Sequence, residues 1–484
     1  MEVCNFNFIN TYSNLNEVFY THLKPASVSK PELVVLNEGL AETLGLDFSR
    51  ITDQQKAALF SGNTLPDGAE PLSQAYAGHQ FGHLAILGDG RAHLLGEHVT
   101  KKAQKFDIQL KGSGRTPYSR SGDGKAALGP MLREYIVSEA MYALGIPTTR
   151  SLAVVYSGEP VFRETTLPGA ILTRVADSHI RVGTFQYAAI QKDINLLQNL
   201  LDFTINRHEP RLKEAENKAL ALLETVSELQ ADLIVHWMRV GFIHGVMNTD
   251  NMTLSGETID YGPCAFMDTY DPNTVFSSID HMGRYAYANQ PKIAQWNIAR
   301  LAEALLPLID PDPDKSVKLA EKTVLNFTNL YETKWLNMMR SKLGLSGSHE
   351  EDEKLISDLL DWMHKNQADY TNIFRDLGAR DSLNTKFYNH KEFMTWRERW
   401  ITRQRKNNTS DEAAFSLMKD SNPAVIPRNH NVEKALKLAE KGNFKYLFKL
   451  LKILKEPYKE GSHLFKYQRP PEPSERVYQT FCGT

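Results

Sequence analysis

The sequence predicts an α+β protein with two lobes, in which a β-rich part is followed by a helical part. Between residues 71 and 190 the chain is rich in glycine and in strand-favouring segments, with one helical segment among them. From about residue 190 onward, apolar residues recur with the spacing of amphipathic helices. A polar loop follows the first long helix of this second part. Strands grouped before helices are typical of an α+β arrangement.

Composition excludes several classes of function. The chain has 484 residues, of which 42% are hydrophobic and 24% charged, as in globular proteins with a large core. Its formal net charge of −2 argues against a general nucleic-acid-binding protein. No apolar run approaches the length of a membrane span, about 20 residues, and the first residues lack the features of a secretory signal. We therefore expect a cytoplasmic protein without a nucleic-acid or membrane partner. The oligomeric state is left open.

The three cysteines predict no zinc site. Cys4, Cys264 and Cys482 are too widely separated for zinc-type spacing, so we interpret them as free thiols, one of them buried. Cys482 stands near the C-terminus in "TFCGT", and this position makes it the candidate for a redox-active thiol. Its reactivity would depend on its thiolate character.

Periodicity assigns elements in the β-rich part. "HLAILGDGRAHLLGEHV" predicts two strands around a Gly-Asp-Gly turn. "KFDIQLKGSG" alternates apolar residues with Asp107, Gln109 and Lys111, which predicts a half-buried strand. "SLAVVYSG" and "GAILTRVA" predict further strands. The helix in "GPMLREYIVSEAMYALG" is expected to have Pro130 in its first turn and to end at Gly145.

The helical part begins with a long helix, "ENKALALLETVSELQADLIVHWMRVG", which Gly241 is expected to end. "IAQWNIARLAEALLPLI" and "EDEKLISDLLDWMHKN" predict later amphipathic helices. "VEKALKLAEKGNFKYLFKLLKILKEP" predicts a basic helical segment. We interpret its lysines as a solvated face, with a membrane or acidic partner as the alternative. The tail "QRPPEPSERVYQTFCGT" is expected to be extended.

The polar loop "HGVMNTDNMTLSGETIDYG" is similar to the catalytic loop of protein kinases. That loop has the pattern His-x-Asp-x-x-x-x-Asn, in which Asp is the base and Asn binds metal. Asn251 lies at the expected offset from His244. We expect a short hairpin after Asn251, followed by Asp260 as the metal-binding residue of an Asp-Tyr-Gly sequence. One amide and one carboxylate suit a hard cation that bridges phosphates.

The expected base is missing from this loop. Val246 stands two residues after His244, where a kinase carries its aspartate, and a valine side chain accepts no proton. The nearest carboxylate is Asp250. It is either a relocated base or an outer-sphere metal ligand or turn former, and the residues alone leave these alternatives open.

The β-rich part carries a candidate for the lysine that holds phosphates in kinases. Lys111 lies at the end of a predicted strand, and Glu134 lies on the next helix as its expected ion-pair partner, with Glu139 as the competitor. Glycine-rich loops, "GDGR" and "GSGRTPYSRSGDGK", flank the lysine and allow backbone N–H groups to approach phosphate. Arg174 and Arg181 follow and add positive charge if they face the same cleft.

Taken together, these segments closely resemble the selenoprotein O family. The resemblance rests on "QLKGSGRTPYSRSGDGKAALGPMLREY", "ILTRVADSHIRVGTFQY", "FIHGVMNTDNMTLSGETIDYGPCAFMD", "GRYAYANQP" and "NPAVIPRNHNVEKAL", and it covers most of the chain. Cys482 is similar to the near-terminal position at which some members carry selenocysteine.

The resemblance implies a protein-kinase-like fold. Its β-rich N-lobe would span residues 71–190 and its helical C-lobe 191–380, with extensions at 1–70 and 381–484. It implies a protein nucleotidyltransferase that binds ATP in a flipped orientation, transfers AMP to protein Ser, Thr or Tyr hydroxyls and releases pyrophosphate. Transfer of UMP from UTP is also implied. A kinase that transfers the γ-phosphate and a non-catalytic, nucleotide-binding pseudokinase stay open as alternatives.

The resemblance also implies roles for individual residues. Asp250 would be the proton acceptor, assisted in catalysis by Lys111 and Glu134. Asn251 and Asp260 would be ligands of Mg²⁺ or Mn²⁺. The implied nucleotide contacts are Gly88, Gly90, Arg91, Lys111, Asp123, Gly124, Arg174, Arg181 and Asp260.

Overall fold

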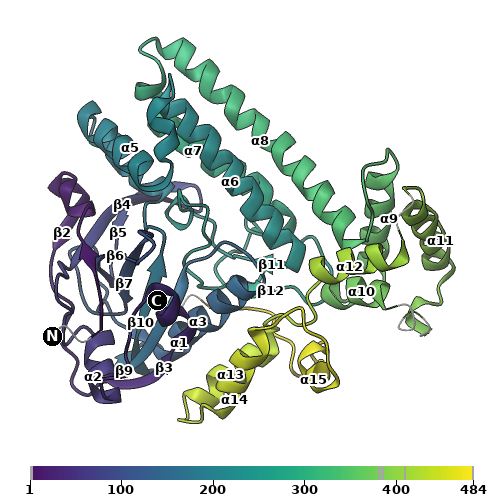
Figure 1. Cartoon of the computed structure of the whole chain (residues 1–484), viewed down its shortest axis with the longest axis horizontal. Coiled ribbons are helices and arrows are strands. Elements are labelled where there is room, and N and C mark those ends of the chain that lie inside the picture. Colours follow the sequence, from purple (N-terminus) through teal and green to yellow (C-terminus); the bar gives the residue numbers. More distant parts are fainter. Residues whose placement is uncertain (1–3, 380–382, 384–385, 408–409, 482–484) are drawn as a thin grey trace.

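The computed structural model of the chain describes residues 4–379, 383, 386–407 and 410–481. It is an α+β protein, as the sequence predicts: an antiparallel sheet lies beside a group of long helices, and shorter helices form the C-terminal part (Figure 1). Among the helices of the described ranges, none combines the length and apolar character that a membrane span requires. Cys482 lies outside the described residues.

Ten strands form the large sheet. Its path runs β2-β4-β6-β7-β10-β9-β3, while β1 pairs with β6, β5 with β4 and β8 with β10. Strands from the first 70 residues therefore lie at both ends of this path. The strands are β1 (Phe8–Ile9), β2 (Tyr20–His22), β3 (Glu32–Leu36), β4 (Leu72–Gln80), β5 (His83–Gly88), β6 (Ala92–Val99), β7 (Lys105–Lys111), β8 (Ala126–Ala127), β9 (Arg150–Phe162) and β10 (Thr166–Ala176).

The strand β7 differs from the half-buried strand that its sequence predicts. Its polar residues Asp107, Gln109 and Lys111 are buried, like the apolar residues on the other face. The physical reason is that each polar side chain meets a partner in the interior: Asp107, for example, accepts hydrogen bonds from His179 and Arg207. Alternation of polar and apolar residues marks two faces but does not reveal that both are covered.

The helix between β8 and β9 in the chain packs against the sheet. It is α3 (Leu128–Ala143), which contacts β9 and β10 and has Pro130 in its first turn. Its predicted apolar stripe is buried, including Leu132 and Ile136. Gly145 follows the helix with a φ of 74°, a left-handed conformation that suits glycine at a helix end. This packing fixes Glu134 between the sheet and the loop that follows α6.

Helices dominate the chain from residue 182 onward, and several of them are long (Figure 1). As predicted, α6 ends at Gly241, whose φ is 73°. The 30-residue helix α8 was not predicted, because only a few of its positions are buried and its apolar stripe is weak. The helices of this part are α4 (Val182–Ile190), α5 (Ile194–His208), α6 (Lys218–Val240), α7 (Gln290–Ile309), α8 (Pro313–Lys342), α9 (Asp352–Lys365), α10 (Tyr370–Gly378), α11 (Lys391–Arg405) and α12 (Asp411–Ser421).

The basic segment near the C-terminus is helical, as predicted, and consists of two helices. They are α13 (Asn429–Ala439) and α14 (Lys445–Leu454), separated by a turn that includes Gly442 with a φ of 76°. Both pack on α3. After the short helix α15 (Phe465–Gln468) the described chain has no further helix or strand, and Thr480 forms an isolated bridge with Ser277. The remaining helices are α1 (Glu38–Leu44) and α2 (Asp53–Phe60).

Candidate active site

A cleft between the sheet and the loop of residues 244–262 contains the predicted nucleotide contacts. Its volume is about 490 Å³, within the range of small-molecule sites. Glu134 does not line the cleft but lies directly behind Lys111. The predicted residues that line it are Gly88, Gly90, Arg91, Lys111, Asp123, Gly124, Arg174, Arg181, Asp250, Asn251 and Asp260.

A network of buried charges forms the floor of the cleft. The Nζ atom of Lys111 lies 2.7 Å from Oε2 of Glu134 and 2.8 Å from Oδ1 of Asp260. Arg174 contacts the same two carboxylates at 2.5 and 2.6 Å. The predicted pairing of Lys111 with Glu134 is thus present. The competitor Glu139 instead pairs with Arg150 of β9, at 2.7 Å.

Asp260 forms ion pairs with three cationic side chains. Besides Lys111 and Arg174, Arg181 donates to its Oδ2 atom at 3.1 Å. Burial alone would raise the pKa of Asp260, but Arg174, Lys111 and Arg181 hold that pKa well below its usual range. The residue also adopts a φ of 60°, which is uncommon outside glycine and often marks functional sites. The carboxylate is therefore ionised, and its orientation is set by the cations around it.

Arg181 links the two sides of the cleft. It donates to the backbone oxygen of Asp250 at 2.8 Å and lies 3.7 Å from the carboxylate of Asp89. Its guanidinium also stacks over the ring of Tyr76, 4.4 Å from the centroid. Only 2% of Arg181 is exposed. It therefore supplies a fixed positive charge to the cleft.

The loop that carries Asp250 and Asn251 is positioned by His244. This histidine is fully buried, bonds through Nε2 to the backbone oxygen of Ile259 at 2.8 Å, and stacks on Trp237. It thus holds the two ends of the loop together. Val246 lines the cleft at the position of the missing base.

The hairpin predicted after Asn251 is not formed. Thr253 pairs with Arg181, and Thr258 pairs with Thr148, in isolated bridges. The backbones of the two segments pair with neighbouring parts of the fold and not with each other; between the segments, the Thr253 hydroxyl donates to the backbone oxygen of Glu257 at 2.7 Å. This prediction was wrong because local sequence does not show that longer-range partners are available for the same backbone groups.

Asp250 lies in a tight pocket beneath β4. It is 8% exposed, and its Oδ1 atom is buried without a hydrogen-bond partner. Gly78 of β4 makes room for it, since a Cβ atom at Gly78 would lie only 2.2 Å from Oδ1. Burial raises the pKa of Asp250 to about 6, although the charge of Arg181 opposes this rise. The side chain is thus poised to accept and release a proton near neutral pH.

The side chains of the loop include oxygen donors for a hard cation. Asn251 donates its amide N–H to the backbone oxygen of Val246 at 2.9 Å, which leaves its carbonyl oxygen for another partner. In the described ranges no cluster of three or more His, Cys, Asp or Glu side chains has metal-site geometry. The donor set of Asn251 and Asp260 fits Mg²⁺ or Mn²⁺ only if phosphate or water oxygens complete the coordination, which is usual for Mg²⁺ at nucleotide sites.

Sequence reasoning missed several residues of the cleft, among them Asp89, Tyr118 and Arg163. Asp89 accepts hydrogen bonds from Gln109 and the backbone of Gln74, and its position within "GDGR" is the signal that marks it. The ring of Tyr118 packs over Gly88, where a Cβ atom would clash with it at 2.4 Å. Arg163 pairs with Asp123 through two bonds, at 3.0 and 3.1 Å. No local pattern singles out Arg163, because it comes from the distant turn between β9 and β10.

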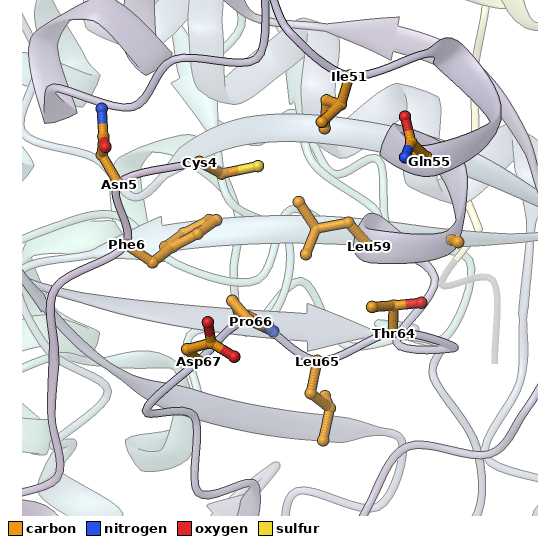
Figure 2. Close-up of a pocket in the computed structure, with 11 residues that line it drawn as sticks. Cys4, Asn5, Phe6, Ile51, Gln55, Leu59, Thr64, Leu65, Pro66 and Asp67 are labelled. Carbon is orange, nitrogen blue, oxygen red and sulfur yellow. The ribbon is translucent and has the colours of Figure 1, made fainter. Parts of the chain in front are cut away.

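A second cavity lies away from these charges, in the N-terminal part of the chain. It is lined by apolar side chains, including Phe6, Leu59 and Leu65, with Cys4 among them (Figure 2). Burial, followed by the charge of Asp47, raises the pKa of the Cys4 thiol, which makes it a poor nucleophile.

Comparison with known proteins identifies the family. The model of the family described as "Protein adenylyltransferase SelO" matches residues 2–455. The chain belongs to this family. The matched range contains all the residues that line the cleft.

Curated relatives agree along the whole length. A protein nucleotidyltransferase YdiU of Nitrosococcus oceani is 57% identical over 480 residues, covering 99% of this chain and 97% of its own. Proteins of the same name from Bacillus cytotoxicus and Pelagibacter ubique are 56% and 55% identical, with 99% of this chain and 98% and 99% of their own lengths covered.

Proposed function

We propose that the chain is a protein nucleotidyltransferase that transfers AMP from ATP to Ser, Thr or Tyr hydroxyls of proteins and releases pyrophosphate. The observation that carries the proposal is the group of three buried cations, Lys111, Arg174 and Arg181, around Asp260 in a cleft that has valine in place of the kinase base. UTP, with transfer of UMP, is the second nucleotide proposed for the same site.

The cations support a flipped nucleotide. A triphosphate that enters with its γ-phosphate innermost carries its largest charge into the interior, where charge is costly unless it is paired. Arg174 and Arg181 lie there, each 2% exposed, and Lys111 lies beside them. This orientation leaves the α-phosphate toward the mouth of the cleft. The glycine-rich loop that contains Gly88 and Gly90 would cover the phosphates.

A divalent cation would be held by Asn251 and Asp260. When bound, it would neutralise phosphate charge and so assist the departure of pyrophosphate. The cations that contact Asp260 in this structure are also those that would bind phosphate, and Glu134 keeps Lys111 and Arg174 in place through direct bonds. We assign Glu134 the role of positioning both side chains.

Asp250 is proposed as the acceptor of the hydroxyl proton. Its Oδ1 atom has no partner, and a pKa of about 6 leaves most molecules ionised at pH 7. The proposed reaction is attack of the acceptor oxygen on the α-phosphorus, with the proton passing to Asp250 and the bond to pyrophosphate breaking. Asp250→Ala should reduce the transfer rate partially, since positioning and charge make the larger contribution. An unchanged rate would exclude Asp250 as the base.

The proposed fold is that of a protein kinase. The β-rich part of residues 71–190 would be the N-lobe and residues 191–380 the C-lobe, with residues 1–70 and 381–484 as extensions. Support comes from Lys111 on a central strand and Glu134 on the helix that packs on the sheet, the arrangement that a kinase uses to orient its phosphate-binding lysine.

Labelled nucleotides test the function. The protein is incubated with Mg²⁺ or Mn²⁺, cell extract and ATP labelled at either the α- or the γ-phosphate. Label from the α-phosphate on protein, with none from the γ-phosphate, is the expected result. Label from the γ-phosphate alone would show a kinase, and ATP binding without any label would show a regulatory pseudokinase. Asp260→Ala serves as the inactive control.

A further inference from the structure

The strand β5 has an open edge. It pairs with β4 from Ala75↔Gly88 to Gln80↔His83, and in the described part of the chain no other strand pairs with it. An open edge presents unpaired backbone groups that another strand can bond. β5 is therefore a place where an extended segment of a second molecule can be added to the sheet.

The bonds of β4 show which residues of β5 face this edge. The backbone N–H groups of His79 and Phe81 bond to Thr249 and Asn248 of the site loop, at 2.7 and 3.2 Å. The backbone N–H and C=O groups of the odd-numbered residues of β4 therefore point away from β5. Because an antiparallel strand alternates the direction of its backbone groups, the residues opposite His79 and Ala77, which are Leu84 and Ile86, turn their N–H and C=O groups to the open edge.

The side chains of this edge are apolar and exposed. Leu84 is 49% exposed and Ile86 is 63% exposed, and both lie on the same face of the hairpin. The strand, "HLAILG", contains no proline, lysine or acidic residue. Natural proteins usually protect exposed edges with such residues because an apolar edge invites pairing with other chains. An unprotected edge is more consistent with a binding function.

The open edge borders the reaction centre. Phe81 and Gly88, just before β5 and at its end, line the cleft. Gly78, which pairs with Ala85 of β5, leaves the space that the Asp250 carboxylate occupies. A segment bonded along β5 therefore runs past the mouth of the cleft and leads its neighbouring residues toward the α-phosphate proposed there.

We propose that β5 binds the acceptor protein by pairing with an extended segment that adjoins the modified hydroxyl. This inference rests on the proposed function, since it assigns the acceptor site of that reaction. Backbone bonds to Leu84 and Ile86 provide affinity without regard to sequence. Two apolar side chains of the acceptor, separated by one residue, pack against the side chains of Leu84 and Ile86. The acceptor is thus an unfolded or extended segment with alternating apolar residues on one side of its Ser, Thr or Tyr.

The proposal is tested with a set of peptides in which one position at a time is varied. Fifteen-residue peptides carry a central Tyr, Ser or Thr, and transfer is measured from ATP labelled at the α-phosphate. We expect apolar residues to be favoured at two positions that are separated by one residue, on one side of the acceptor. Proline between or at these positions should lower kcat/KM at least tenfold. Equal transfer at all positions, with proline tolerated, would overturn the proposal.

A charge introduced on the edge gives an independent test. Ile86→Glu should lower kcat/KM for the favoured peptide at least tenfold. A peptide in which lysine replaces one of the two apolar residues should restore kcat/KM for this variant. Leu84→Glu should lower kcat/KM by a similar factor, and lysine at the other of the two apolar peptide positions should restore it. Val317→Glu is the matched control, because Val317 is 47% exposed on the distant helix α8. The Kd for ATP, measured without peptide, should be the same in all variants. Weaker ATP binding by both Ile86→Glu and Leu84→Glu would assign the edge to nucleotide binding and overturn the proposal.

Two further outcomes separate the proposals. If no peptide or protein receives label from the α-phosphate, the proposed function itself fails. If label is transferred without positional preference, only strand pairing at β5 fails.

Sedimentation tests whether a second copy of this chain occupies the edge. The wild-type protein and Ile86→Glu are compared. A dimer that Ile86→Glu dissociates would make the edge an interface between copies of this chain and overturn its assignment to the acceptor.

Discussion

Glu134 and Asp260 share the same two cations. Lys111 lies 2.7 Å from one carboxylate and 2.8 Å from the other, and Arg174 contacts them at 2.5 and 2.6 Å. Glu134 comes from α3 and Asp260 from the loop after α6, so the shared cations join the β-rich part to the helical part. The loss of either carboxylate affects both the interior charge balance and the cleft.

Glu134→Gln should destabilise the protein and reduce transfer. Arg174 is 2% exposed, and breaking a buried ion pair typically costs about 3–5 kcal/mol because a buried charge loses its partner. Glu392→Gln is the control, since its pair with Lys365 is solvent-exposed and should contribute about 1 kcal/mol or less. Urea unfolding measures both. Equal losses of unfolding free energy would show that the network does not stabilise the fold in this way.

Asp260→Asn should abolish transfer. The substitution keeps the size of the side chain but removes the charge that holds Lys111, Arg174 and Arg181 and that would bind the divalent cation. We expect a loss of at least about 10³-fold in kcat, as for other removed electrostatic groups. Asp271→Asn, at a partly exposed carboxylate, is the control and should keep wild-type transfer. Wild-type transfer by Asp260→Asn would remove this residue from the mechanism.

Gly78→Ala should slow transfer without weakening ATP binding. The added Cβ atom would lie 2.2 Å from Oδ1 of Asp250, so the carboxylate has to move. A displacement of about 1 Å typically costs on the order of 10²-fold in rate. Gly39→Ala in α1 is the matched control, because its nearest contact would be 3.9 Å away. The measurement is kcat alongside the Kd for ATP. A normal kcat would mean that the position of Asp250 does not matter.

The free energy of unfolding should fall in mild acid because His93 is buried. Burial lowers the pKa of His93 to about 4, compared with about 6.5 in an unfolded chain. Below pH 6.5 the unfolded state therefore binds more protons, so the stabilisation present above pH 6.5 is lost as the pH falls toward 4. His93 alone should contribute a loss of about 2 kcal/mol at pH 5.

Urea unfolding at pH 7 and pH 5 measures this effect. His93→Gln removes the titrating group, so its unfolding free energy should change less between the two pH values than that of the wild type. His463→Gln, at an exposed position, should retain the wild-type difference. An identical pH dependence for wild type and His93→Gln would contradict the assignment.

Motif spacing predicted much of the candidate site. Asn251 and Asp260 were found from their offsets within one loop, and Lys111 and Glu134 from a strand followed by a helix. The structure brings these residues together in or directly behind one cleft, and their roles stay predictions. Their location is predictable because each motif lies within a short segment, whose local geometry depends on its own residues. The helix ends at Gly145 and Gly241 were predictable for the same reason, since a left-handed turn favours glycine.

Arrangements that depend on distant segments were not predictable. Arg163 pairs with Asp123 across 40 residues, and Thr253 finds Arg181 in place of the expected hairpin partner. The open edge of β5 was equally hidden, because strand pairing depends on which segments are close in space. Periodicity describes one segment at a time and contains no information about its partners.

By itself, the sequence determined the α+β class, the order of strands and helices, and the residue types of the charged cleft. Only the tertiary structure decided that Arg174 and Arg181 point at Asp260, that both faces of β7 are buried, and that Gly78 leaves space for Asp250. The physical reason is that charge pairing and burial act over a few ångströms, and the fold alone brings residues that are far apart in the chain to such distances.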